Sequence, residues 1–316
     1  MEGTVIRQHL GHYLVASARE QYLCALSTRL RKQLQYPEAS PGSRRRRVQR
    51  VRRVRVTDPV AIGDHVEFDV GDGETGMIRL IAERRNKISR RASGTSPREQ
   101  ILAANVDRVV PIFSLNDPPP DFDLLDRMLA IAEGENIDAV ICINKTDLGT
   151  ADAFEKAIEN YARIGYEVVK TSTIDDVGRT DIHAVLDQGT SLFMGPSGVG
   201  KSSLLNWLQP GLELRTGEVS ELTREGRHTT THLELVTLRS GGLVGDIPGV
   251  KEFKLWDVQP EDTPALFREF EPYLGGCRFR DCAHIREPDC AIKNAVDDGE
   301  IFQRRYASYL ELRASP

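Results

Sequence analysis

Residues 195–202 read Gly-Pro-Ser-Gly-Val-Gly-Lys-Ser, which matches the G-x-x-x-x-G-K-S pattern of a phosphate-binding loop. An apolar strand pattern, Ser191–Met194, precedes the loop, and a helical pattern, Leu204–Leu208, follows it. Glycines let backbone N–H groups surround a phosphate, and the N-terminus of the following helix adds a favourable dipole. The stretch therefore predicts a mononucleotide site in an α/β fold.

Two side chains of this loop have predicted roles in binding and in phosphate chemistry. Lys201 is expected to neutralise the β- and γ-phosphates, which also makes it a catalytic candidate, and Ser202 is expected to coordinate Mg²⁺. The residues assigned to nucleotide binding in this stretch are Gly195, Pro196, Ser197, Gly198, Val199, Gly200, Lys201, Ser202 and Ser203.

A second motif follows the strand pattern Ile137–Ile143, at the strand end where open α/β sheets bind ligands. Its residues are Asn144, Lys145, Thr146 and Asp147. The Asp147 carboxylate can accept two hydrogen bonds from guanine, which adenine cannot supply. Asn144 would bond the loop and the base edge, and the Lys145 stem would lie over the ring. Alone the motif is a weak turn signal, but with a phosphate loop it predicts selection of GTP over ATP. In an ordinary GTPase this motif comes after the phosphate loop, so the order here is reversed.

The tetrapeptide Asp246-Ile247-Pro248-Gly249 ends another strand pattern, Leu243–Gly245, and matches the D-x-x-G element of GTP switches. Asp246 is expected to hold Mg²⁺ through water, and the Gly249 N–H to sense the γ-phosphate. Asp175–Gly178 matches the same short pattern, but it lacks a preceding apolar strand and lies before the phosphate loop. We therefore assign the switch to Asp246 and Gly249.

The stretch from Gly226 to Thr231 lies between the loop and this aspartate and contains three threonines. Thr230 is the favoured ligand of Mg²⁺ and the γ-phosphate, with a threonine-rich strand start as the alternative. Val250 stands where a glutamine orients water in Ras-like GTPases, so slow intrinsic hydrolysis is expected. His228 is the candidate for polarising water, with a structural or RNA-contacting role as the alternative.

Three cysteines and one histidine crowd within fourteen residues near the end of the chain. They are Cys277, Cys282, His284 and Cys290. Three thiolates and an imidazole close a tetrahedral shell around Zn²⁺ and leave no position for water, so a structural site is expected. Because so short a stretch has little core, metal binding would supply its folding energy.

The net charge of −5 hides an uneven distribution along the 316 residues. Residues 1–95 hold 19 Lys and Arg against 10 Asp and Glu, and the remainder holds 23 against 37. This asymmetry indicates that the N-terminal residues 1–95 face nucleic acid, with a merely solvated basic surface as an equal alternative.

No apolar run approaches the length of a membrane span, and the start lacks the layout of a signal peptide. A cytoplasmic protein without a membrane partner is expected.

Short β-rich segments, broken by Gly, Asp and Pro, fill residues 1–95 and fit a small antiparallel barrel. They are Thr4–Ile6, Tyr13–Ala16, Tyr22–Leu26, Val60–Val70 and Met77–Ile81. The Arg-rich run Arg44–Arg55 between them is expected to be mobile until phosphate orders it. From about residue 97, strands alternate with helices, which predicts a parallel sheet with right-handed crossovers.

With these motifs in hand, the chain resembles the RsgA (YjeQ/YloQ) family of circularly permuted GTPases, which depend on the small ribosomal subunit. The resemblance spans nearly the whole chain and implies an N-terminal OB-fold β-barrel in residues 1–95. It further implies a circularly permuted α/β P-loop GTPase in residues 96–272 and a zinc-binding segment in residues 273–316. The implied activity is hydrolysis of GTP, with Mg²⁺, stimulated by the small (30S) subunit during its late maturation. The barrel and the zinc segment would contact rRNA.

Two features depart from the family pattern. The Arg44–Arg55 run is unusually dense, and Val169-Lys170-Thr171-Ser172 replaces the usual Ser-Ala pair beside the guanine.

Two other functions remain open: an RNA-binding assembly chaperone that GTP merely orders, and a GTPase of the large subunit. A monomer is expected. Because Gly249 belongs to the last nucleotide motif before Cys277, the permuted order suggests that the γ-phosphate state is passed to the zinc segment.

Overall fold

The computed structural model describes residues 1–9, 11–18, 20–35, 58–91, 99–149, 152–212, 233–247 and 259–314. They form two compact units, of which the first holds Met1–Val106 with residues 233–237 and the second holds the other described residues. The Arg44–Arg55 run, the stretch 226–231 and residues 248–250 lie outside the described residues. Within the described ranges, no helix combines the length and the apolar character needed to cross a membrane.

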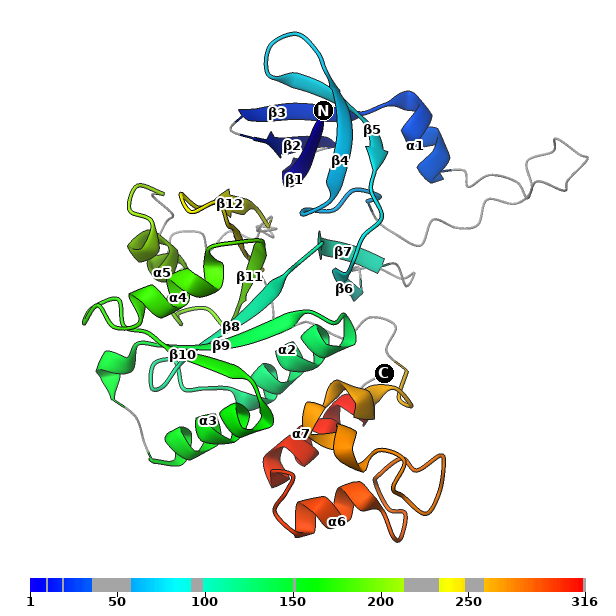
Figure 1. The fold of residues 1–316 in the computed structure, drawn as a ribbon, viewed down its shortest axis with the longest axis vertical. Helices are drawn as coiled ribbons and strands as arrows, with labels where there is room; N and C mark the ends of the chain where they lie inside the picture. The colour runs from blue at the N-terminus through cyan, green and yellow to red at the C-terminus, as the bar shows by residue number, and fades with distance from the viewer. Residues whose placement is uncertain are drawn as a thin grey trace, which may run out of the picture. The chain divides into compact units, whose positions relative to one another are not determined.

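Five strands of the first unit close into a barrel in the order β1-β2-β3-β5-β4 (Figure 1). They are β1 (Glu2–His9), β2 (His12–Ser17), β3 (Glu20–Leu26), β4 (His65–Val70) and β5 (Thr75–Ile81), with α1 (Thr28–Gln35) after β3. Alternate side chains, among them Tyr13, Val15, Phe68 and Ile78, fill the interior. The predicted OB-fold barrel is confirmed. Its purely antiparallel character is wrong, since β3 and β5 run parallel. A closed ring of five strands cannot alternate direction throughout, so one parallel pair is required.

The strand predicted over Val60–Val70 begins only at His65, because a buried carboxylate turns the chain before it. Asp64 is fully buried and accepts a hydrogen bond from the Ala61 N–H at 2.7 Å. Its two oxygens also accept from the Arg84 guanidinium at 2.6 and 2.7 Å. These bonds stabilise a turn, so residues 60–64 make isolated pairings and do not form a strand.

A two-stranded sheet in the same unit is absent from the sequence prediction. Its strands, β6 (Lys87–Arg91) and β7 (Glu99–Ala104), pair antiparallel, and the predicted boundary at residue 95 falls between them. Ala103 forms a β-bridge with Ile62. Gly63 has a φ of +87°, and a Cβ on it would lie 2.0 Å from the Ala104 carbonyl oxygen. Only glycine allows this close approach.

A six-stranded sheet has the order β10-β9-β8-β11-β13-β12, and its first five strands belong to the second unit. Its strands are β8 (Arg108–Ser114), β9 (Asp138–Asn144), β10 (Glu167–Lys170), β11 (Thr190–Met194), β12 (Leu235–Thr237) and β13 (Leu243–Asp246). The first five strands in that order pair in parallel, which confirms the predicted parallel sheet. Their carboxyl ends therefore share one edge, where the nucleotide motifs begin.

Helices cover both faces of this sheet, so its strands are apolar runs rather than alternating ones. α2 (Phe122–Gly134) and α3 (Asp152–Ile164) lie on one face, and α4 (Arg179–Leu186) and α5 (Lys201–Leu208) lie on the other (Figure 1). α2 begins directly after Asp121, whose carboxylate accepts a hydrogen bond from the Leu124 N–H at 3.0 Å and so caps the helix.

Before the metal ligands the chain forms a pair of short 3₁₀ helices, η3 (Thr263–Leu266) and η4 (Arg268–Tyr273). Pro264 and Pro272 remove backbone donors there and prevent a continuous α-helix. α6 (Ala291–Asp297) and α7 (Gln303–Ala314) complete this C-terminal segment, and η3 and α7 pack against α2. Phe267, Phe270 and Tyr309 form its aromatic centre, with ring centroids 5.1–5.7 Å apart.

Candidate nucleotide-binding site and metal cluster

The phosphate-binding loop follows β11 and leads into α5, and its glycines are required by geometry. Gly198 and Gly200 have φ values of +88° and +95°, in the left-handed region that glycine adopts without strain. At Gly195 a Cβ would lie 2.3 Å from the Ile112 carbonyl oxygen, and at Gly200 it would lie 2.5 Å from Asn144 Nδ2. The loop is thus held close to the ends of β8 and β9.

Asn144 joins the two motifs that the sequence separates. Its Nδ2 donates to the Val199 carbonyl oxygen in the phosphate loop at 2.8 Å. Its Oδ1 accepts from the Thr171 hydroxyl at 3.0 Å, and Asn144 and Thr171 are both buried. The amide is therefore fixed in one orientation, and the guanine motif and the phosphate loop form a single site.

Hydroxyl groups after β10 position the rest of the guanine motif. The Ser172 hydroxyl donates to Asp147 Oδ1 at 2.7 Å and itself accepts from the Asp175 N–H at 3.0 Å. The Lys145 ammonium donates to the Asp117 carbonyl oxygen at 2.7 Å, and Lys145 has a φ of +60°. The sequence placed Thr171 and Ser172 in the loop beside the guanine but left their contacts open. The available signal was a pair of hydroxyl residues directly after the strand that neighbours β9.

Lys201, the first residue of α5, lies near Asp246, the last residue of β13. The Lys201 ammonium donates to the carbonyl oxygens of Gly195 at 2.8 Å and Pro196 at 3.1 Å, and lies 3.9 Å from Asp246 Oδ1. Burial lowers the pKa of Lys201, with Asp246 opposing the shift. Burial raises the pKa of Asp246 to about 6, with Lys201 opposing.

One oxygen of the Asp246 carboxylate lacks a hydrogen-bond donor within the part of the chain that the structure describes. Asp246 Oδ1 is buried and has no hydrogen-bond partner among the described residues. Mg²⁺ prefers hard oxygen ligands, and Ser202 in the first turn of α5 supplies a second one from the same loop. The residues present therefore fit a magnesium ion. Thr230, His228 and Gly249, assigned to the same site from the sequence, lie outside the described residues.

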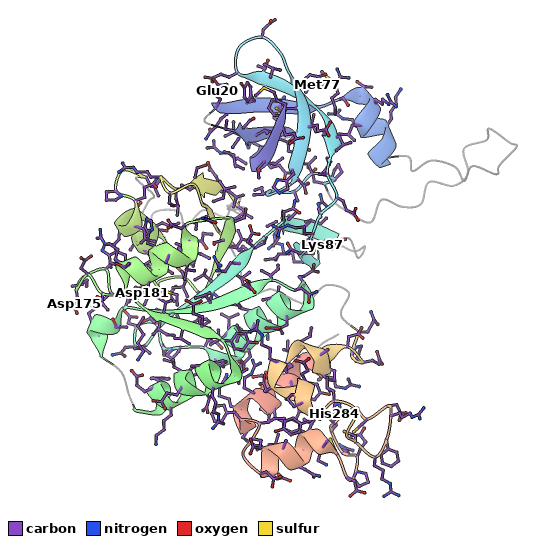
Figure 2. The ribbon with its side chains drawn as sticks, in the orientation of Figure 1. Glu20, Met77, Lys87, Asp175, Asp181 and His284 are labelled. Atoms are coloured by element: carbon purple, nitrogen blue, oxygen red, sulfur yellow. The ribbon has the colours of Figure 1, made fainter. Side chains whose placement is uncertain are left out.

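The four predicted metal ligands come together in the C-terminal segment, where Figure 2 labels His284. Their ligand atoms all lie within 4.8 Å of one another. His284 Nδ1 lies 3.5 Å from Cys277 Sγ and 3.4 Å from Cys290 Sγ, and these two sulfurs are 3.9 Å apart. A tetrahedral centre with metal–sulfur bonds of about 2.3 Å needs sulfurs about 3.8 Å apart. The cluster can hold a metal ion.

Hydrogen bonds from neighbouring side chains hold the loop of metal ligands, residues 277–290, in place. The Tyr309 hydroxyl donates to the Ala283 carbonyl oxygen at 2.6 Å, and the Tyr306 hydroxyl donates to that of His284 at 2.7 Å. The Glu287 carboxylate accepts from the backbone N–H groups of Ala283 and Ile285 at 3.0 and 2.9 Å. Backbone N–H donors hold the pKa of Glu287 down at about 2. α7 thus carries part of the shell that orients the ligands.

Chelation is expected to unfold this ligand loop without unfolding the sheet, because residues 277–290 contain few buried apolar side chains. After treatment with a strong chelator, the three cluster thiols should react with a thiol reagent, while the buried Cys24 and Cys142 should stay protected. Mass-resolved thiol labelling measures this. Equal protection of all five cysteines after metal removal would contradict the expectation.

The fold and the site together define a circularly permuted P-loop GTPase. The family model for the RsgA GTPase matches residues 81–256, and the chain belongs to the RsgA GTPase family. A curated relative from Moorella thermoacetica, "Small ribosomal subunit biogenesis GTPase RsgA", is 40% identical over 99% of this chain and 97% of its own length. The protein of the same name from Caldanaerobacter subterraneus is 35% identical over 99% of this chain and 94% of its own.

Solved structures resemble the chain over the same extent. YjeQ from Thermotoga maritima gives a TM-score of 0.75 at 30% identity, covering 99% of this chain and 97% of that one. YloQ, described as a circularly permuted GTPase, gives a TM-score of 0.68 at 31% identity and covers 99% of this chain and 93% of its own. The resemblance therefore includes the barrel, the sheet and the C-terminal segment.

Proposed function

We propose that this chain hydrolyses GTP to GDP and phosphate when stimulated by the small ribosomal subunit, and thereby assists late maturation of that subunit. The observation that carries the proposal is the Asn144–Val199 contact, which unites a guanine motif and a phosphate loop in one site. Curated relatives that match nearly the whole chain are named small ribosomal subunit biogenesis GTPases, which supports the choice of partner.

In this proposal, the site residues divide between base and phosphates. Asp147 reads guanine, and Asn144 holds the base motif against the loop. Lys201 neutralises the β- and γ-phosphates. Ser202 and Asp246 hold Mg²⁺, which supplies charge neutralisation on the phosphate oxygens. Thr230, Gly249 and His228 keep the roles predicted from the sequence, namely the two switches and the polarisation of water.

We further propose that the metal is Zn²⁺, because three thiolates and one imidazole are its preferred structural set. The basic residues 1–95 and the zinc-binding residues 273–316 would contact rRNA, and residues 96–272 would form the GTPase. The protein would act as a cytoplasmic monomer. The γ-phosphate state would reach the zinc segment through the second switch, and GTP hydrolysis would release the protein from the subunit.

Adding purified small subunits is expected to raise GTP turnover several-fold or more, because Val250 leaves the free protein without a water-orienting glutamine. Phosphate release over time measures this, with purified large subunits as the control. Unchanged turnover with small subunits, or equal stimulation by large subunits, would contradict the proposal.

A Lys201→Ala variant distinguishes a hydrolysing switch from a chaperone that GTP merely orders. The variant should bind or hydrolyse GTP poorly and fail to support subunit maturation in cells. Normal subunit binding together with normal maturation would make hydrolysis incidental.

A further inference from the structure

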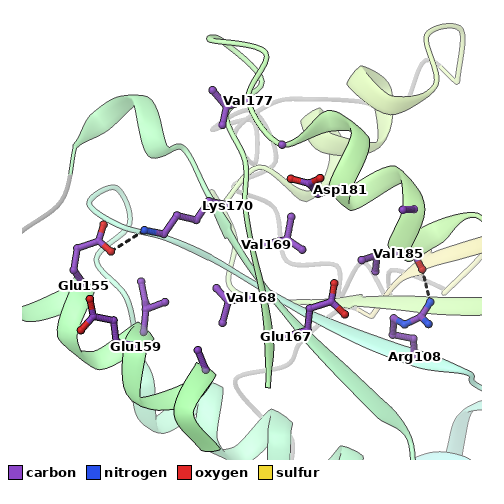
Figure 3. A pocket seen from close by; sticks show the side chains of 14 residues that line it. Arg108, Glu155, Glu159, Glu167, Val168, Val169, Lys170, Val177, Asp181 and Val185 are labelled. Carbon is purple, nitrogen blue, oxygen red and sulfur yellow. Dashed lines mark hydrogen bonds and ion pairs between the residues drawn. The ribbon is translucent and has the colours of Figure 1, made fainter. Parts of the chain in front are cut away.

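The sheet of the second unit has an uncovered edge beside a groove. β10 is an edge strand with β9 on one side only. A groove of about 800 Å³ runs along its other side, between α3 and α4 (Figure 3). The buried side chains of Ile158 from α3 and Val185 from α4 line it, and Val177, which is 46% exposed, adds an apolar surface.

The backbone of β10 presents free hydrogen-bonding groups to this groove. The Thr171 N–H donates to the Ile143 carbonyl oxygen, and the Thr171 carbonyl oxygen accepts from the Thr146 N–H, so residue 171 faces β9. Along a strand in a parallel sheet, successive residues turn their N–H and C=O groups to opposite sides. Val168 and Lys170 therefore face the groove. An edge of this kind is a template for another strand.

Gly178 limits the exposed edge of β10 at its C-terminal end. A Cβ on Gly178 would lie 2.0 Å from the Lys170 carbonyl oxygen, so the loop before α4 covers that oxygen closely. An added strand would therefore pair with Val168 and with the Lys170 N–H, and would extend towards Glu167. This short edge sets the register of any incoming chain.

The charges along the groove select the kind of partner. Four carboxylates line it, from Glu155, Glu159, Glu167 and Asp181, against two cations, Arg108 and Lys170. Lys170 is paired with Glu155 at 2.7 Å, and Arg108 donates to the Val185 carbonyl oxygen. Within the described ranges, no cation pairs with the other three carboxylates, and Figure 3 shows them on both sides of the strand.

We propose that this groove binds an extended, basic segment of a partner protein as an added strand along β10. Backbone hydrogen bonds to Val168 and Lys170 supply affinity, as in other cases of strand addition to a sheet edge. Lys or Arg side chains of the segment pair with Glu159 on the α3 side and with Glu167 and Asp181 on the α4 side. The surplus of negative charge repels nucleic acid, whose phosphates bind cations. The inference does not depend on the proposed function.

A labelled peptide, Arg-Val-Arg-Thr-Arg-Val-Arg, tests the groove by fluorescence anisotropy with the full chain. The variant Glu159→Gln/Glu167→Gln/Asp181→Asn is expected to bind the peptide about tenfold more weakly. The matched control Glu261→Gln/Asp298→Asn/Glu300→Gln makes the same charge change at exposed positions away from the groove and should bind normally. Both variants should keep GTP affinity, which verifies their folding. Equal weakening in both variants would overturn the proposal, because overall charge would then explain the binding.

Strand addition has its own readout. A peptide of the same sequence with alternate amides N-methylated keeps the charges but cannot pair along the strand, and it should lose binding. The parent peptide should slow amide hydrogen exchange at Val168 and Lys170. Equal binding of both peptides, or unchanged exchange at these two amides, would overturn strand addition. Competition by a single-stranded oligouridylate for the same groove would overturn the choice of a protein partner.

Discussion

Arg305→Ala is expected to lower the free energy of unfolding by about 3–5 kcal/mol, since it leaves the buried Glu269 carboxylate without its cation and takes one of two cations from the buried Asp126 carboxylate. Arg305 is 1% exposed. Its guanidinium donates to both oxygens of Glu269 at 2.6 and 3.0 Å, and to Asp126 Oδ1 at 2.8 Å. Burial opposes its charge, but Asp126 and Glu269 outweigh burial and raise the pKa of Arg305 well above its usual value. Urea unfolding at neutral pH measures the loss.

The loss should be large because Asp126 is also the centre of a wider network. It accepts from the Tyr161 hydroxyl of α3 at 2.5 Å, from the Ser308 hydroxyl of α7 at 2.6 Å, and from the Arg304 guanidinium at 3.2 Å. These bonds connect α2, α3 and α7 within one cluster, in which Asp126, Tyr161 and Ser308 are buried. Removing Arg305 therefore weakens the attachment of the metal-binding segment to the sheet as well as one ion pair.

Arg278→Ala is the matched control, because it makes the same substitution in the same segment at an exposed pair. Arg278 lies 3.1 Å from Asp289, and both side chains are more than 60% exposed. Exposed pairs contribute at most about 1 kcal/mol. If the two variants lost similar stability, burial of the Arg305 network would not be the cause.

Much of the fold was predictable because local pattern decides it. β8 is buried from Val109 to Ser114, and such unbroken runs are typical of parallel strands covered on both faces. The hairpin of β6 and β7 was missed because Lys87–Arg91 contains three cations and has no clear alternation. Pairing with Glu99–Ala104 orders it, and pairing is not visible in either segment alone.

The functional site, like the fold, has features that follow from local sequence and others that depend on contacts between distant residues. The phosphate loop, the guanine motif and the metal ligands are local spacings, so the sequence indicates them directly. Thr171 and Ser172 gain their role only when β10 lies beside β9, which places them at Asn144 and Asp147. Asp126 and Arg305 are 179 positions apart, and nothing near either residue predicts their contact.

Asp147→Asn is expected to reverse base selectivity, lowering GTP affinity by about 10²- to 10³-fold and making xanthosine triphosphate the preferred nucleotide. A carboxylate accepts from guanine N1–H and the exocyclic amine, whereas an amide has one acceptor and two donors. Xanthine carries a carbonyl where guanine carries that amine, so the amide can donate to it. The Ser172 hydroxyl, which donates to Asp147 Oδ1 at 2.7 Å, can donate equally to the new amide oxygen. The side chain should therefore keep its position.

Competition titrations of the two nucleotides against a fluorescent GTP analogue measure this reversal. Asp175→Asn is the matched control, since Asp175 is exposed and contributes only its backbone N–H to Ser172. That variant should keep the affinity for GTP. If Asp147→Asn retained GTP selectivity, Asp147 would not read the base. If both nucleotides weakened equally while the melting temperature held, Asp147 would support the loop without selecting the base. A preference for xanthosine triphosphate alone would establish that this carboxylate reads guanine, although its motif precedes the phosphate loop.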